Sequence, residues 1–82
     1  MFEGITKDNM PAAIEAMLFV STEPVSTETM AEMLEADVSD VQMALHRLQQ
    51  DLEEGHRGIQ LAELGRGWRL LSHSAFHDLI EP

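Results

Sequence analysis

The stretch IEAMLFVSTEPVS, residues 14–26, begins with a helical run whose apolar side chains are not confined to one side. Pro11 suits the first turn of a helix, with Asn9 or Met10 near the cap, and polar residues and a proline end the run after Val20. The apolar arc of this helix covers roughly 260°, whereas one core needs about 100° or slightly more. An 82-residue domain has one small core. The second apolar side of the helix must therefore be shielded from water by something other than this core.

A helical wheel divides this first helix into two faces. The inward face, with Ala13 and Val20 at its margin, consists of Met10, Ile14, Met17 and Leu18. The candidate dimer or partner interface comprises apolar residues that point elsewhere, namely Ala12, Ala16, Phe19, Val20 and, from the third helix, Met43. Three covers are possible: an N-terminal arm carrying Phe2 and Ile5, another domain, or a second copy of the chain. We predict an interface that contains Phe19.

Two further helices follow at short intervals. Ser26 or Thr27 is a good N-cap for the second, and the spacing of Ser39 and Gln42 predicts a capping box at the start of the third. Gly55 is expected to end the third helix in a left-handed conformation. The apolar residues of the third helix recur at helical spacing and predict its core face: Val41, Ala44, Leu45, Leu48 and Leu52.

From Ile59 onward, apolar residues recur at every second position and no longer at helical spacing. This alternation indicates a β-hairpin with its turn at residues 65–67. The turn sequence Gly-Arg-Gly suits a hairpin and does not open a helix, so its glycines are not expected to bind phosphate. One short closing helix is expected between Ser72 and Ile80. The fold class is therefore mainly α with a small β-hairpin, a winged helix-turn-helix over residues 11–82 preceded by an arm at residues 1–10.

The charge of the chain bears on its partners. Fifteen acidic residues against five Lys and Arg give −10, a field that repels nucleic acid. The third helix, which would enter the major groove in a DNA-binding protein, has one arginine against four carboxylates after residue 39, a net of −3. A wing patch of Arg57, Arg66 and Arg69 either pairs with carboxylates or binds the minor groove. A DNA-binding winged-helix regulator is the alternative function.

Catalytic and metal chemistry have little support in the sequence. The chain has no cysteine, no nucleophile motif and no phosphate-binding glycine loop, so no catalytic or cofactor-binding residue is assigned. His73 and His77 would share a face of the closing helix, but a third metal ligand is missing, and we expect surface histidines. A metal-dependent enzyme is the third, remote alternative. With no signal peptide or apolar span in the sequence, we expect a soluble cytoplasmic protein.

The sequence resembles the N-terminal domain of the segregation and condensation protein B (ScpB) family from about residue 11 to about residue 77. The resemblance rests on IEAMLFVSTEPVS, on Leu34, Val41, Leu45 and Leu48, and on HRGIQLAELGRGWRLLS at residues 56–72. It implies a dimerising, non-enzymatic winged helix of bacterial condensin that works with the kleisin ScpA and, through it, the SMC ATPase. Such proteins associate with the nucleoid through the complex. The family typically has two tandem winged helices, of which this chain matches the first, and kleisin binding relies substantially on the second.

Overall fold

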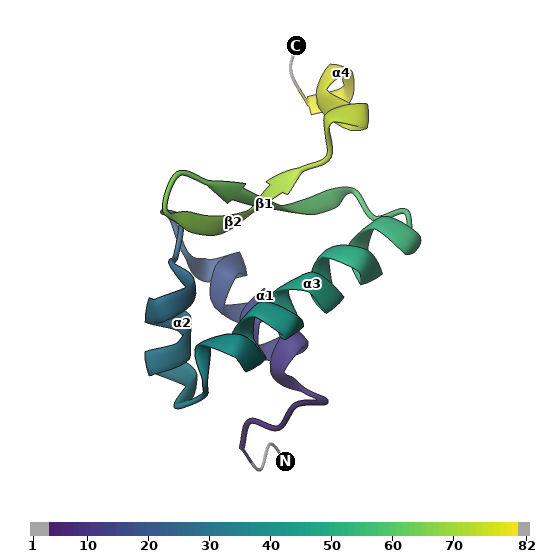
Figure 1. Cartoon of the computed structure of the whole chain (residues 1–82). Helices are drawn as coiled ribbons and strands as arrows, with labels where there is room; N and C mark the ends of the chain where they lie inside the picture. The colour runs from purple at the N-terminus through teal and green to yellow at the C-terminus, as the bar shows by residue number, and fades with distance from the viewer. Residues whose placement is uncertain (1–3, 81–82) are drawn as a thin grey trace.

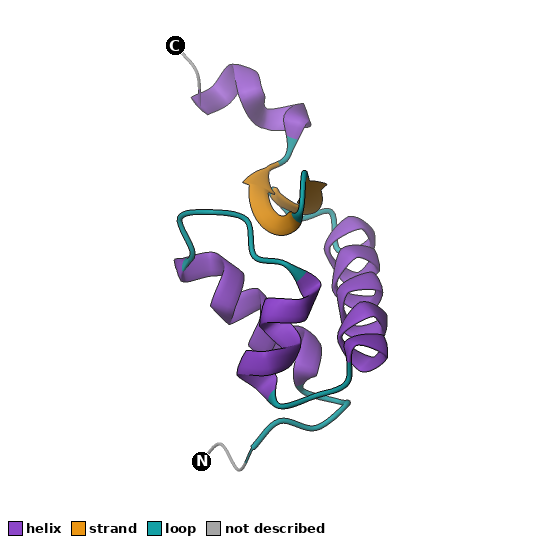
Figure 2. Cartoon of the chain, turned by 60° about the vertical axis from the view of Figure 1, so that its left-hand side comes forward, coloured by secondary structure: helices purple, strands orange, loops and turns teal. Residues whose placement is uncertain are grey.

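Three helices, a two-stranded hairpin and a short C-terminal helical segment follow one another in the computed structural model, which describes residues 4–80 (Figure 1). The elements are α1 (Met10–Val20), α2 (Thr27–Leu34), α3 (Val38–Glu54), β1 (Ile59–Leu64), β2 (Gly67–Ser72), the 3₁₀ turn η1 (Ser74–Phe76) and α4 (His77–Ile80). Figure 2 shows the hairpin between the three-helix body and the C-terminal helix. The predicted winged-helix fold is confirmed.

The core lies where α3 packs against α1, α2 and β1, while β2 packs on α1. The predicted inward face of α1 is buried except for Met17, which is half-buried against the core. All five apolar residues predicted for the inner face of α3 are buried. Ile14, Met30, Val41 and Leu45 are the most completely enclosed large side chains. The apolar periodicity of both helices therefore identifies the core side of each.

The segment between α1 and α2 is bound to the hairpin. The N–H of Val25 donates to the carbonyl of Trp68 at 3.0 Å, and the N–H of Trp68 donates to the carbonyl of Val25 at 2.8 Å. The indole Nε1 of Trp68 also donates to Thr27 Oγ1 at 3.2 Å. The EPVS and GRGW stretches, about forty residues apart in sequence, thus form one contact.

The N-cap of α2 is Ser26, as predicted, and its Oγ accepts a hydrogen bond from the Thr29 N–H at 3.0 Å. The capping box predicted at Ser39 is wrong, because α3 begins at Val38 and its N-cap is Asp37, whose side chain makes no capping hydrogen bond. The cause is the turn that ends α2. Glu35 adopts a left-handed conformation, and the Ala36 N–H donates to Ala31 O at 3.0 Å. This tight turn ends α2 in so few residues that α3 begins at Val38.

The left-handed cap predicted for Gly55 is also wrong. Gly55 has φ −80°, and the next residue, His56, has φ 51°. The Arg57 N–H donates to Leu52 O at 3.2 Å, which closes the Schellman pattern around His56. The helix therefore reverses direction one residue later than the glycine suggested.

The hairpin has the expected position and a two-residue turn. Leu64 pairs with Gly67, and Gly65 adopts φ +59°, as the first central position of a tight hairpin turn favours. The single closing helix expected from Ser72 to Ile80 is replaced by η1 and the four-residue α4. His73 lies before these turns as the N-cap of η1, so it does not share a helical face with His77.

Candidate functional site

The outward face of α1 is open to solvent along its whole length. Ala12 and Ala16 are exposed, and the side chains of Phe19 and Val20 are 78% and 74% exposed. Of the arm residues proposed as a cover, Phe2 lies outside the described residues, whereas Ile5 packs against the core beside Leu34 and Ala36. The described part of the arm therefore leaves Phe19 uncovered.

Met43 is exposed as the sequence suggested, but it does not adjoin Phe19. It borders a small hollow that also contains Met10 and Pro11, at the start of α1. Phe19 lies in the last turn of α1, some eight residues or about 12 Å further along the helix axis. The structure thus brings Ala12, Ala16, Phe19 and Val20 into one stripe and leaves Met43 beyond its N-terminal end.

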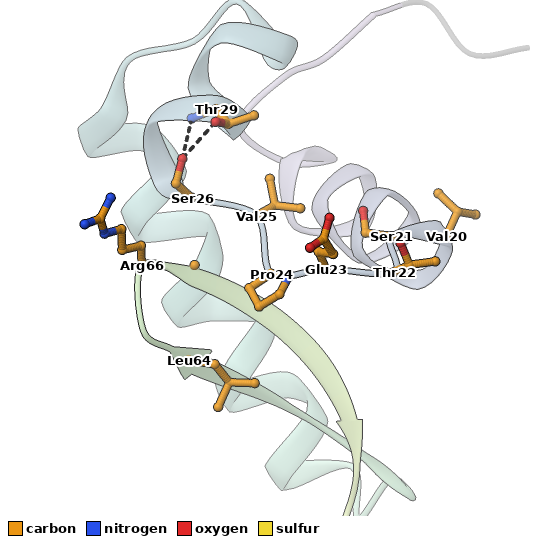
Figure 3. A pocket seen from close by; sticks show the side chains of 11 residues that line it. Val20, Ser21, Thr22, Glu23, Pro24, Val25, Ser26, Thr29, Leu64 and Arg66 are labelled. Atoms are coloured by element: carbon orange, nitrogen blue, oxygen red, sulfur yellow. Dashed lines mark hydrogen bonds between the residues drawn. The ribbon is translucent and has the colours of Figure 1, made fainter.

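A hollow of about 720 Å³ lies between the α1–α2 segment and the hairpin turn (Figure 3). Val20 forms part of it and connects it to the stripe on α1, while Leu64 and Arg66 line it from the hairpin. Ser26 Oγ donates to Thr29 Oγ1 at 2.8 Å at its edge. Its walls combine apolar side chains with hydroxyls, and no side-chain polar atom in the described residues is buried without a partner. Through Val20, the hollow is continuous with the exposed stripe on α1.

The arginines predicted as a wing patch are not gathered in one place. Arg57 precedes β1, whereas Arg66 lies in the turn at the other end of the hairpin, about 20 Å away along a six-residue strand. Arg69 lies on β2 opposite Ala62. Within residues 4–80 the ion pairs are Lys7–Asp40 at 3.9 Å and Arg47–Asp51 at 3.6 Å, and neither includes an arginine of the wing.

The two histidines considered as metal ligands have different surroundings. Nδ1 of His73 accepts a hydrogen bond from the Ala75 N–H at 3.1 Å, and His77 begins α4. Across the part of the chain that the structure describes, there is no group of three histidine or carboxylate side chains able to hold a metal ion. In that same part, no helix has the length and apolarity needed to span a membrane.

Sequence reasoning did not find a hollow between α1 and α3, whose walls include Leu48, Leu52 and Arg47. The helical pattern assigns Leu48 and Leu52 to the core, where they are buried. Their second role as the floor of an open hollow depends on how far apart α1 and α3 lie. That distance has no signature in the local sequence.

Comparisons with known proteins agree on one family. The family model for the segregation and condensation complex subunit ScpB matches residues 12–82. Segregation and condensation protein B of Carboxydothermus hydrogenoformans is 40% identical over 73 residues, which cover 89% of this chain and 40% of that protein. The Bacillus cereus protein of the same name is 32% identical, with 82% of this chain and 37% of that protein covered. The chain thus spans about two fifths of the length of these relatives.

Two solved structures are similar over nearly the whole chain. The crystal structure of ScpB from Mycobacterium tuberculosis has a TM-score of 0.88 at 26% identity, covering 96% of this chain and 49% of that one. A crystal structure of a dimer of the ScpB N-terminal domain complexed with a ScpA peptide has a TM-score of 0.84 at 31% identity, covering 90% and 93%. The second comparison matches almost all of a single-domain chain.

Proposed function

This chain belongs to the ScpB family of segregation and condensation complex subunits, and from that premise we propose that it is a non-enzymatic, protein-binding part of the bacterial SMC–kleisin condensin complex. In this role it forms a homodimer and contacts the kleisin ScpA, and through ScpA it works with the SMC ATPase in chromosome condensation and segregation. It acts in the cytoplasm and reaches the nucleoid as part of the complex.

The observation that carries this proposal is the exposed stripe on α1. Helix α1 buries Ile14 on one side and exposes Phe19 on the other. Another chain that covered the exposed side would remove its apolar surface from water, which is favourable. The related ScpB N-terminal domain crystallised as a dimer with a ScpA peptide, which is the kind of assembly that such a stripe would support.

The alternative of DNA recognition has less support. In a DNA-binding winged helix, α3 would face phosphate, yet α3 carries four acidic residues and only Arg47, which already pairs with Asp51. Arg57 and Arg66 lie at opposite ends of the hairpin and do not combine into one basic surface. Protein binding therefore remains the favoured function.

Sedimentation equilibrium of the purified chain at micromolar concentrations tests the homodimer. We expect a dimer for the wild type and a monomer for Phe19→Glu, since a carboxylate in the contact would be buried without a partner. Met33→Glu is the matched control, because Met33 is 61% exposed on α2, away from the stripe. A wild-type chain that stays monomeric under these conditions would refute the dimer.

Kleisin contact is tested separately by calorimetric titration with a ScpA peptide. We expect binding to the wild-type chain in the presence and absence of duplex DNA, and no heat on titration with the duplex alone at physiological salt. A tight complex with the duplex that weakens steeply as salt rises would favour the DNA-binding regulator instead.

A further inference from the structure

The hollow between α1 and α3 adjoins the exposed stripe on α1. Its volume is about 420 Å³, and its apolar floor includes Pro11, Ala12, Leu48 and Leu52. The two leucines are only 4% and 6% exposed, so their side chains are held firmly by the core beneath. The floor is therefore a preformed apolar surface, of the kind that accepts an anchoring side chain from a partner.

The rim of this hollow is charged. Arg47 and Asp51 form an exposed i,i+4 pair on α3, and Arg57 lies at the far end. Asp8 and Glu15 line the hollow from the side of α1. An apolar floor within a charged rim is the usual anatomy of a protein–protein contact. The guanidinium groups also favour an aromatic occupant, because an arginine over a ring face makes a cation–π contact.

The exposed aromatic side chain and the hollow lie at opposite ends of the same helix. Ala12 and Phe19 are seven residues apart, so they lie on one side of α1, about 10 Å from each other along its axis. Ala16 lies between them on the exposed face and offers only a methyl group. A second helix can therefore approach closely at the middle of α1.

A two-fold axis perpendicular to α1 near residues 15 and 16 relates these features to their own copies. Such an axis runs the two α1 helices antiparallel and brings residue 19 of one copy over residue 12 of the other, twice. We propose that Phe19 of each protomer enters the α1–α3 hollow of its partner in the homodimer. This inference rests on the proposed dimer and specifies how the two chains meet.

Self-complementarity selects a second copy as the occupant. One two-fold operation fills both hollows with both phenylalanines and leaves neither exposed. A head-to-tail contact would leave Phe19 open at one end of a growing chain and a hollow open at the other end. The two-fold symmetric dimer leaves no contact of this kind unsatisfied and does not grow further.

A charge-swap experiment tests the contact. Ala12→Lys fills the hollow with a charged side chain, and Phe19→Glu removes the anchor; each variant alone should weaken the dimer at least about thirtyfold, as a central anchor residue does. When the two variants are mixed, each heterodimer keeps one native Phe19 contact and places the introduced glutamate beside the introduced lysine. We expect the mixture to associate to within about tenfold of the wild type. Met33→Lys, which adds the same charge elsewhere, should dimerise normally.

The outcomes separate the inference from the function on which it rests. A monomeric wild type would overturn the dimer itself. A dimeric wild type with an equally tight Ala12→Lys dimer, or a mixture that fails to associate, would overturn only the Phe19 contact. Circular dichroism of each variant checks that it is folded, and both substituted positions are exposed in the monomer.

A disulfide provides a second measurement that is independent of the charges. Because the chain has no cysteine, Ala16→Cys introduces a single thiol near the inferred two-fold axis. We expect mild oxidation to link two copies through this thiol in high yield, whereas Met33→Cys should remain unlinked. Equal linking of the two variants, or none at Ala16→Cys in a dimeric sample, would contradict the proposed arrangement.

Discussion

Gly67 lies where the hairpin passes over the backbone of the α1–α2 segment. A Cβ built on it would be 2.8 Å from the carbonyl carbon of Pro24 and 2.8 Å from the nitrogen of Val25. These are backbone atoms already held by the Val25–Trp68 hydrogen bonds, so they cannot move aside cheaply. Gly67 is thus needed because the backbones of the hairpin and the α1–α2 segment come too close for a Cβ. Gly65, two residues earlier, is needed for its positive φ.

We expect Gly67→Ala to lower the free energy of unfolding by about 1–3 kcal/mol, because the added methyl group overpacks a rigid contact. Gly58→Ala is the matched control: its Cβ would meet nothing within 4 Å, and Gly58 is not among the glycines with positive φ. The control should change stability by less than about 1 kcal/mol. Urea unfolding followed by circular dichroism measures both variants, and equal stabilities would contradict the close-contact explanation.

At the scale of the elements, the caps of α2 and α3 provide the next test. Ser26→Ala should lower the free energy of unfolding by about 1 kcal/mol, since the Ser26 hydroxyl accepts from the Thr29 N–H at 3.0 Å. Ser39→Ala should change it by less than about 0.5 kcal/mol, because Ser39 lies inside the first turn of α3 and is exposed. Thermal unfolding of the two variants side by side makes the measurement. A comparable loss of stability for Ser39→Ala would instead support a capping box at Ser39.

These two serines illustrate what local sequence determines. The pattern at Ser26 agrees with the structure, because Ser26 has the extended backbone of an N-cap and its side chain accepts from the Thr29 N–H. The sequence pattern at Ser39 is equally good. However, the tight turn at Glu35 places the N-cap of α3 at Asp37, two residues before Ser39. At the other end of α3, the reversal moves from Gly55 to His56 for a similar reason. Element type and core face follow from periodicity, whereas end positions depend on how each turn closes.

The candidate interface is likewise predicted only in part by the sequence. The exposure of Phe19 follows from the wheel of one helix, because a side chain opposite Ile14 cannot also reach the core. The hollow over Leu48 and Leu52 requires α1 and α3 to be packed together, and the separation of Met43 from Phe19 requires the same packing. The sequence therefore predicts that Phe19 is exposed and does not predict the hollow between α1 and α3.

For the whole molecule, the net charge of −10 sets the sign of the salt dependence. Two copies that associate through the α1 stripe bring like charges together, and this repulsion falls as added salt shortens the Debye length from about 10 Å at 0.1 M to about 3 Å at 1 M. The apolar contact itself has no charge to screen. We therefore expect the dimer dissociation constant to decrease when NaCl is raised from low to high concentration, as measured by sedimentation equilibrium.

The same titration distinguishes the two functions, because a complex with nucleic acid has the opposite dependence. Lys and Arg side chains that bind phosphate displace counterions, so such a complex weakens as salt rises. Replacing Arg66 and Arg69 with glutamine supplies the control, since it makes the chain more acidic and should weaken the dimer at low salt while reducing any affinity for a duplex; Arg57 is left in place because it borders the α1–α3 hollow. A dimer that instead dissociates as salt increases would mean that ion pairs across the interface, and not the α1 stripe, hold the two copies together.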